Sequence, residues 1–214
     1  MPQQKVFNKI AQITNLCYII IMNTHFHRRN LPHLYFNDGI YFITARLVNS
    51  IPLEKLELLK KMNRENVNEK DKRLFKKYDA LIDSGEFGEN YLNIKPCAEI
   101  VKNCLHYPDG KDYKLICYCI MPNHFHLVFE LLENNKGISK ILQSIKRKAA
   151  RECNKILNRK GKFWQDESFD RWVRDNKELY FVIRYVLLNP VKAGLVENLS
   201  EWEYTYCRKG YDVI

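Results

Sequence analysis

The sequence predicts an α+β domain built on one antiparallel sheet, with helices on one face of that sheet. Strands are predicted at residues 40–48, 113–120, 124–132 and 169–175, where β-branched and aromatic residues are frequent. Helices are predicted at residues 96–105, 137–157 and 176–188, where apolar side chains recur every three or four positions. With a charged insertion at residues 53–89 set aside, the elements follow the order βαββαβ and a terminal helix. That order is the split βαβ, or ferredoxin-like, pattern, and we expect its sheet to have one open face.

Local signals mark the boundaries of these elements. A turn at Asp38-Gly39 precedes the first strand, and a turn at residues 108–110 separates the first helix from the second strand. The insertion at residues 53–89 carries partial apolar stripes on a charged background, which predict two helices. Pro122-Asn123 interrupts the run of strand residues, and it predicts either a tight hairpin or a kink.

The chain length of 214 residues fits one domain with a substantial core. We expect residues 31–206 to form that domain, between an N-terminal extension at residues 1–30 and a tail at residues 207–214. The apolar run at residues 13–22 is too short to span a bilayer, so we expect no membrane partner. Seven scattered cysteines without a C-x-x-C pair argue against a zinc knuckle and favour reduced thiols in the cytoplasm.

The chain is strongly basic. It has 35 Lys and Arg residues against 25 Asp and Glu residues, which gives a formal net charge of +10. This charge favours a nucleic-acid partner over an anionic membrane surface, although a basic surface without a partner is the simplest alternative. On the helix at residues 137–157, Lys146, Arg147, Lys148 and Arg151 lie opposite the apolar stripe. We expect these side chains to follow a phosphate backbone, unless they form only a solvated helix face.

Aromatic residues follow this basic helix. Phe163, Trp164 and Trp172 could stack on unpaired bases, an interaction worth roughly 1–3 kcal/mol per base.

The tripeptide His124-Phe125-His126 is the strongest candidate for chemistry. Alternate side chains of a strand point to the same side, so the two imidazoles would face one way and Phe125 the core. Two neutral imidazoles can hold part of the ligand shell of a divalent cation. The simpler alternative is a pair of polar residues on a solvated sheet face. A second His-Phe-His at residues 25–27 is flanked by polar and basic residues, and we interpret it as a loop without a metal role.

The helix at residues 176–188 supplies a candidate nucleophile. Asn176 or Asp175 is the expected cap, and Asn189-Pro190 is expected to end the helix. Tyr185 and Asn189 are four residues apart and share a side of the helix. A tyrosine beside a metal site can attack phosphorus, and Asn189 could offer an oxygen to the same metal. For one tyrosine among 13, packing or a surface hydroxyl is the simpler role.

Six stretches of the sequence together carry a family resemblance. They are Leu31-Pro-His33, Tyr41-Phe-Ile-Thr-Ala-Arg46, Met121-Pro-Asn-His-Phe-His126, Phe163-Trp-Gln165, Phe169-Asp-Arg171 with Val173-Arg-Asp175, and Tyr185-Val-Leu-Leu-Asn-Pro-Val-Lys-Ala-Gly-Leu195. In this order they resemble the single-tyrosine HUH transposases, also called IS200-like, and most closely their REP-associated branch. The resemblance covers roughly residues 31–206.

The resemblance implies a transposase, an enzyme that cleaves single-stranded DNA and transfers the strand at REP-like hairpins. By this comparison His124 and His126 bind Mg²⁺ or Mn²⁺, and Tyr185 forms a 5′-phosphotyrosine intermediate. Asn189 stands where related transposases place a metal-binding Gln. Arg171 lies in one of the matching stretches, and we expect it to contact the DNA. The resemblance fits a monomer or a homodimer.

Two other functions remain open on these residues. One is a nucleic-acid binding protein of the same fold that does not catalyse a reaction. The other is a metal-dependent nuclease in which water is the nucleophile. Only the transposase predicts a covalent protein–DNA adduct.

Overall fold

The computed structural model describes residues 24–28, 32–36, 38–52, 54–57, 80–83 and 87–212. Most of the insertion predicted to hold two helices therefore lies outside the described residues. At the N-terminal side, β1 (Thr24–Arg28) and β2 (Pro32–Phe36) form a two-stranded antiparallel sheet. The loop predicted for residues 25–27 is wrong, because their backbone pairs with residues 33–35 of β2.

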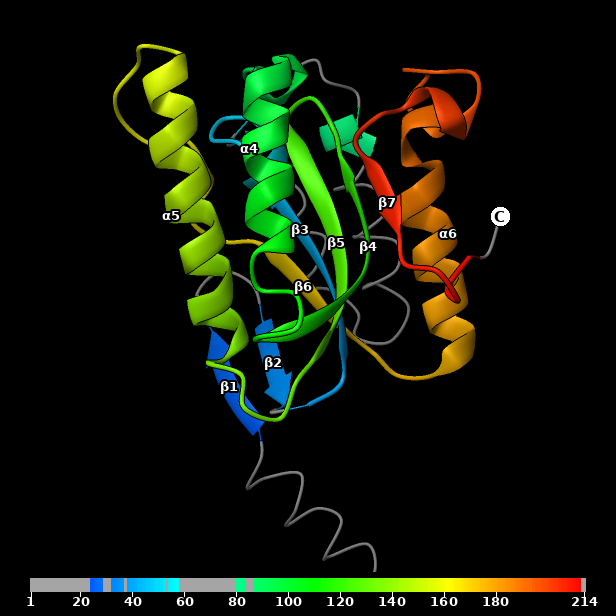
Figure 1. The fold of residues 1–214 in the computed structure, drawn as a ribbon. Helices are drawn as coiled ribbons and strands as arrows, with labels where there is room; N and C mark the ends of the chain where they lie inside the picture. Colours follow the sequence, from blue (N-terminus) through cyan, green and yellow to red (C-terminus); the bar gives the residue numbers. More distant parts are fainter. Residues whose placement is uncertain are drawn as a thin grey trace, which may run out of the picture.

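The main sheet has five strands in the order β6-β3-β5-β4-β7, and every neighbouring pair is antiparallel (Figure 1). The elements are β3 (Ile40–Arg46), η1 (Tyr91–Asn93), α4 (Lys95–His106), β4 (Tyr113–Ile120), β5 (His124–Leu131), α5 (Ile138–Ile156), β6 (Phe169–Val173), α6 (Asn176–Lys192), η2 (Leu199–Glu201) and β7 (Thr205–Cys207). Strand β5 lies between β3 and β4, which are joined through α4. This is the split βαβ arrangement, and the predicted fold class is confirmed.

Two apolar cores lie on opposite faces of the sheet. Helices α4 and α5 cover one face, where they bury Phe125, Leu127 and Phe129 of β5 (Figure 1). The other face was expected to be open, but α6 packs against it through its apolar stripe. That core contains Leu179, Ile183 and Val186 of α6 with Phe42, Ile116 and Val128 of the sheet. The helix that carries Tyr185 therefore lies directly on the sheet.

The interruption at Pro122-Asn123 is a tight hairpin. The Met121 N–H donates to the His124 carbonyl at 2.8 Å, which closes a two-residue loop between β4 and β5. The Asn123 carbonyl accepts from the Leu47 N–H at 2.8 Å, which ties the loop to the end of β3. His124 is therefore the first residue of β5, at a fixed position beside the hairpin.

Helix α6 continues past its predicted end. Asp175 caps its N-terminus as expected, since its carboxylate accepts from the Glu178 N–H at 2.7 Å. The predicted stop at Asn189-Pro190 is wrong, because the helix includes Pro190 and ends at Lys192. Proline has a helical φ, so the chain can continue through Pro190, although the Val186 carbonyl receives no N–H from this residue. Hydrogen bonds to the Asn189 and Pro190 carbonyls, from Ala193 and Leu195, complete the last turn.

The sheet extends into the segment predicted as a tail. Cys207 is the last residue of β7, which pairs with β4. The next residue, Arg208, donates from Nη2 to both carboxylate oxygens of Asp109 at 2.8 and 2.6 Å. All six described cysteines are free thiols. Within the described part of the chain, no helix is long and apolar enough to cross a membrane.

Candidate active site

Both histidines of the His-Phe-His tripeptide point toward α6. Strand alternation sends Phe125 into the core beneath α4 and α5, while His126 stacks on Phe42 of the opposite core with ring centroids 5.6 Å apart. The Nε2 atoms of His124 and His126 are 3.1 Å apart. Both side chains are fully buried, with 0% of their surface exposed. The tripeptide therefore forms a pair of imidazoles with converging nitrogens, as predicted.

The outer nitrogen of each ring is held by a neighbouring side chain. Asn123 donates from Nδ2 to the Ile82 carbonyl at 3.1 Å, which directs its Oδ1 toward His124 Nδ1 at 2.7 Å. This contact places a proton on His124 Nδ1 and leaves the lone pair on Nε2. His126 Nδ1 lies 2.9 Å from the Thr44 hydroxyl on β3. Such contacts typically orient histidines that ligate metals.

Burial also keeps His126 in the form that binds metals. Removal from water holds the pKa of His126 well below its usual range, and the nearby His124 and Lys192 lower this pKa further. A neutral imidazole has a lone pair to give, whereas an imidazolium has none.

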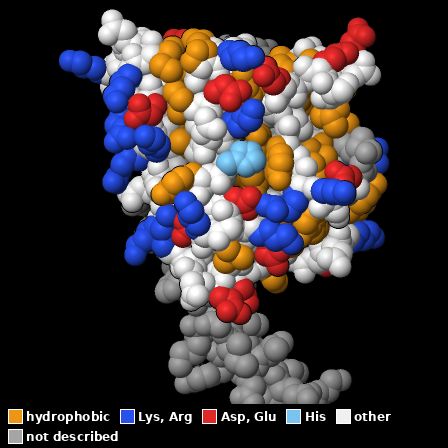
Figure 2. All heavy atoms as spheres, in the orientation of Figure 1, with side chains coloured by type: hydrophobic (Ala, Val, Ile, Leu, Met, Phe, Trp, Pro, Cys, Tyr) orange, Lys and Arg blue, Asp and Glu red, His pale blue; other side chains and the backbone are white. Residues whose placement is uncertain are grey.

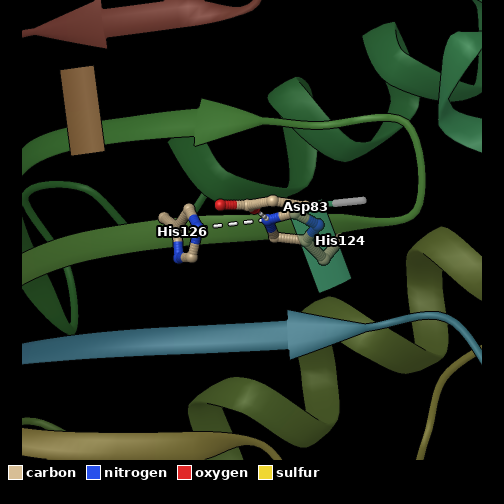
Figure 3. Close-up of side chains that lie close together, drawn as sticks. All are labelled: Asp83, His124 and His126. Carbon is tan, nitrogen blue, oxygen red and sulfur yellow. Dashed lines mark hydrogen bonds and ion pairs between the residues drawn. The ribbon is translucent and has the colours of Figure 1, made fainter. Parts of the chain in front are cut away.

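Asp83, which no sequence pattern marks as a ligand, lies beside the histidines. Asp83 Oδ1 is 3.3 Å from His124 Nε2, and one ligand atom from each of Asp83, His124 and His126 lies within 4.8 Å of the others (Figure 3). Asp83 lies in the charged insertion, where one carboxylate among many gives no local signal. Its position follows from the Asn123–Ile82 hydrogen bond, which holds the end of the insertion against the hairpin.

Tyr185 and Asn189 complete the cluster from α6. Asn189 is fully buried, and its Nδ2 donates to the Tyr185 hydroxyl at 3.1 Å and lies 3.3 Å from His126 Nε2. The ring of Tyr185 packs edge-on against His126 and Phe42, with centroids 5.4 and 6.0 Å apart. The side shared by Tyr185 and Asn189, predicted from their spacing, thus faces the histidines.

The residues at this site suit a divalent cation. Among the described residues, Oδ1 of Asp83 and Oδ1 of Asn189 are buried and accept no hydrogen bond, which is costly unless another partner binds them. Carboxylate and amide oxygens are preferred ligands of Mg²⁺ and Mn²⁺. Adjacent ligands of an octahedral ion at about 2.1 Å are about 3.0 Å apart. The Nε2 separation of 3.1 Å is close to that value.

The basic residues predicted to bind DNA have different surroundings. Lys146 is half-buried, and its ammonium donates to the Gln165 and Asp166 carbonyls and to the Ser168 hydroxyl at 2.6, 2.9 and 3.2 Å. Burial lowers the pKa of Lys146 to about 8. Its DNA contact stays a prediction, but in this structure the ammonium holds the loop that precedes β6.

Arg147, Lys148 and Arg151 are exposed on α5. Lys and Arg side chains gather along the edge of the molecule formed by this helix (Figure 2). Arg151, Lys148 and Lys155 share one carboxylate, that of Glu152, at 2.9, 3.4 and 3.4 Å. These cations hold the pKa of Glu152 at about 2. The helix therefore keeps a net positive surface.

Trp164 and Arg171 are less available than the sequence suggested. Trp164 is 4% exposed and packs edge-on against Phe125 and Phe163. Its stacking on a base stays a prediction, and its burial argues against it. Arg171 lies on the edge strand β6 and forms an ion pair with Glu178.

Fold and site together define a class: an α+β domain whose central strand presents two histidines to a tyrosine on a covering helix. The family model described as "Transposase IS200 like" matches residues 89–187, which include His124, His126 and Tyr185. A "Putative REP-associated tyrosine transposase" of Haemophilus influenzae is 30% identical over 113 residues, which are 49% of this chain and 62% of that protein. The "REP-associated tyrosine transposase" of Escherichia coli is 24% identical over 95 residues, 44% of this chain and 54% of that protein.

A solved structure shares the fold. It is a REP-associated tyrosine transposase bound to a REP hairpin, with a TM-score of 0.55 and 18% identity over 84% of this chain and 80% of that one. The chain spans only 62% and 54% of the length of the two curated relatives. The chain is similar to IS200-like transposases and to REP-associated tyrosine transposases, and the resemblance seen in the sequence is confirmed.

Proposed function

We propose that this chain cleaves and rejoins single-stranded DNA at hairpins through a covalent bond between Tyr185 and a 5′ phosphate. One observation carries the proposal. Asn189 Nδ2 lies 3.1 Å from the Tyr185 hydroxyl and 3.3 Å from His126 Nε2, so a single side chain links the tyrosine to the histidine pair. The relatives are named transposases, and the structural neighbour is described with a REP hairpin.

Tyr185 is the nucleophile in this proposal. Its ring is held edge-on by His126 and Phe42, and its hydroxyl is positioned by Asn189. A fixed hydroxyl loses little freedom when it meets a phosphate, which is a large part of what an enzyme contributes to such a step. The phosphate in the resulting 5′-phosphotyrosine is still a phosphodiester, now between Tyr185 and the DNA. A 3′-hydroxyl of a DNA strand end can therefore attack this phosphate, release Tyr185 and rejoin the DNA.

His124, His126 and Asp83 would hold Mg²⁺ or Mn²⁺, and Asn189 could add its Oδ1. When bound, the metal would polarise the scissile phosphate and offset the charge that develops on it. Asn123 and Thr44 orient the two imidazoles, and burial favours the neutral form of His126.

The exposed cations of α5 would hold the DNA backbone, since phosphate contacts supply most of the sequence-independent affinity. Helices α5 and α6 lie on opposite faces of the sheet (Figure 1), and Tyr185 of α6 packs against the core on the α6 side. A strand bound along α5 must therefore pass around an edge of the sheet to reach the tyrosine. Lys146 ties α5 to the loop that leads into edge strand β6, and Arg171 lies on that strand. We propose that the unpaired DNA next to the hairpin passes over this edge of the sheet, at β6.

The test is incubation of the full chain with a labelled hairpin oligonucleotide and Mn²⁺. We expect a slowly migrating protein–DNA band that survives denaturant with wild type and is absent with Tyr185→Phe. Cleavage by Tyr185→Phe at the wild-type rate would favour water as the nucleophile. Binding by wild type without cleavage would favour the non-catalytic alternative.

A further inference from the structure

A third polar side chain lies on the tyrosine side of α6. Tyr185, Asn189 and Lys192 are spaced by four and three residues, so they lie one above another on the helix. Lys192 Nζ is 4.9 Å from the centroid of the Tyr185 ring. This position depends on the continuation of α6 through Pro190. A helix that stopped at residue 188 would leave Lys192 in the following loop.

The Lys192 ammonium has no carboxylate partner among the residues that the structure describes. By contrast, Arg171 of β6 and Arg174, which lies between β6 and α6, both form ion pairs with Glu178. Lys192 is exposed, so its flexible stem can reorient toward an incoming anion. The charge of Lys192 also acts on His126, since it helps to lower the pKa of that imidazole. Among the described residues, the site thus has a lysine without a carboxylate partner beside its candidate nucleophile.

We propose that Lys192 binds a non-bridging oxygen of the phosphate that Tyr185 attacks, which would make it a catalytic residue. This inference rests on the proposed function. In the step, the bond between Tyr185 Oη and phosphorus forms as the bond from phosphorus to the 3′ oxygen breaks. The phenol loses its proton to solvent and the departing 3′ oxygen gains one, so Lys192 keeps its own protons throughout. Its charge faces the negative charge that builds on the phosphoryl oxygens in the transition state.

A purely structural role is the alternative. A lysine over an aromatic ring can stabilise the fold through a cation–π contact. In that case removal of the charge would lower the melting temperature and change the rate only through disordered packing. Contact with the phosphate would instead lower the rate of the covalent step and leave the fold and the DNA affinity nearly unchanged.

Four full-length proteins separate these roles: wild type, Lys192→Gln, Lys192→Arg and Lys177→Gln. Lys177 lies on the same helix, is exposed, and provides a matched loss of charge. The probe is an oligonucleotide hairpin with unpaired flanks and Mn²⁺, and single-turnover adduct formation is measured. Fluorescence anisotropy without metal gives the DNA affinity, and thermal unfolding gives the stability.

We expect Lys192→Gln to slow adduct formation about 100-fold, the usual effect of removing one group that stabilises a transition-state oxyanion. Lys192→Arg should recover most of the rate, and Lys177→Gln should match wild type. An unchanged rate in Lys192→Gln, or a slow rate accompanied by lower melting temperature and failed rescue by Arg, would overturn the inference. If wild type forms no adduct, the proposed function fails and this inference falls with it.

Discussion

Replacing Thr44 with Val tests whether the histidine pair is built for a cation. The Thr44 hydroxyl lies 2.9 Å from His126 Nδ1, and Thr44 is fully buried. Valine has nearly the same shape but cannot hydrogen-bond. The variant loses a bond worth about 1 kcal/mol and leaves a buried ring nitrogen unpaired, for a total of about 2 kcal/mol. In a domain of this size that lowers the melting temperature by about 4–8 °C.

The more specific effect of Thr44→Val is on metal affinity. Loss of a contact that orients a metal-binding histidine typically weakens binding about 10–100-fold. Isothermal titration calorimetry with Mn²⁺ measures this change, and Thr44→Ser serves as the control because it keeps the hydroxyl. We expect the serine variant to bind Mn²⁺ nearly as wild type does. Equal Mn²⁺ affinity in Thr44→Val and wild type would refute the idea that Thr44 directs His126 toward a cation.

Three further predictions follow from the same geometry. In metal-free protein the free energy of unfolding should fall as the pH drops from 7 to 5. The reason is that the pKa of His126 in the folded protein lies below its value of about 6.5 in the unfolded chain. Protons therefore bind preferentially to the unfolded chain and stabilise it. In urea titrations His126→Gln should reduce this slope by up to about 1.4 kcal/mol per pH unit, and an unchanged slope would mean that His126 titrates normally. Asp83→Asn should weaken Mn²⁺ binding about tenfold or more in calorimetry, and wild-type affinity would exclude Asp83 as a ligand. Joint replacement of Arg147 and Lys148 by Gln should weaken hairpin binding and flatten its dependence on log[salt] by about 0.7–0.9 per lost phosphate contact, whereas an unchanged slope would place the DNA elsewhere.

The strands and helices that form the site could be predicted because their signals are local. Alternation along β5 placed His124 and His126 on the same side of that strand. Helical spacing placed Tyr185 and Asn189 on the same side of α6. The sequence pattern did not predict which surface α6 packs against. One face of the sheet was predicted to be open, but α6 covers this face because Leu179, Ile183 and Val186 pack against its apolar side chains.

The parts that escaped prediction depend on contacts between distant segments. Asp83 reaches the histidines because Asn123 holds the backbone of Ile82, 41 residues away. Lys146 resembles its exposed neighbours in sequence, and only the fold of the loop before β6 gives it three acceptors. Pro190 was interpreted as a helix stop, but α6 continues to Lys192, and N–H groups of Ala193 and Leu195 bind the Asn189 and Pro190 carbonyls.

The proposed function requires that Tyr185 itself becomes bonded to DNA. After incubation with a hairpin oligonucleotide and Mn²⁺, digestion of the protein and the DNA should leave a short nucleotide remnant on one peptide, which mass spectrometry can locate. We predict a 5′-phosphodeoxynucleotide on Tyr185 and no remnant in Tyr185→Phe. A remnant on another residue, or cleaved DNA with no remnant at all, would show that Tyr185 is not the nucleophile.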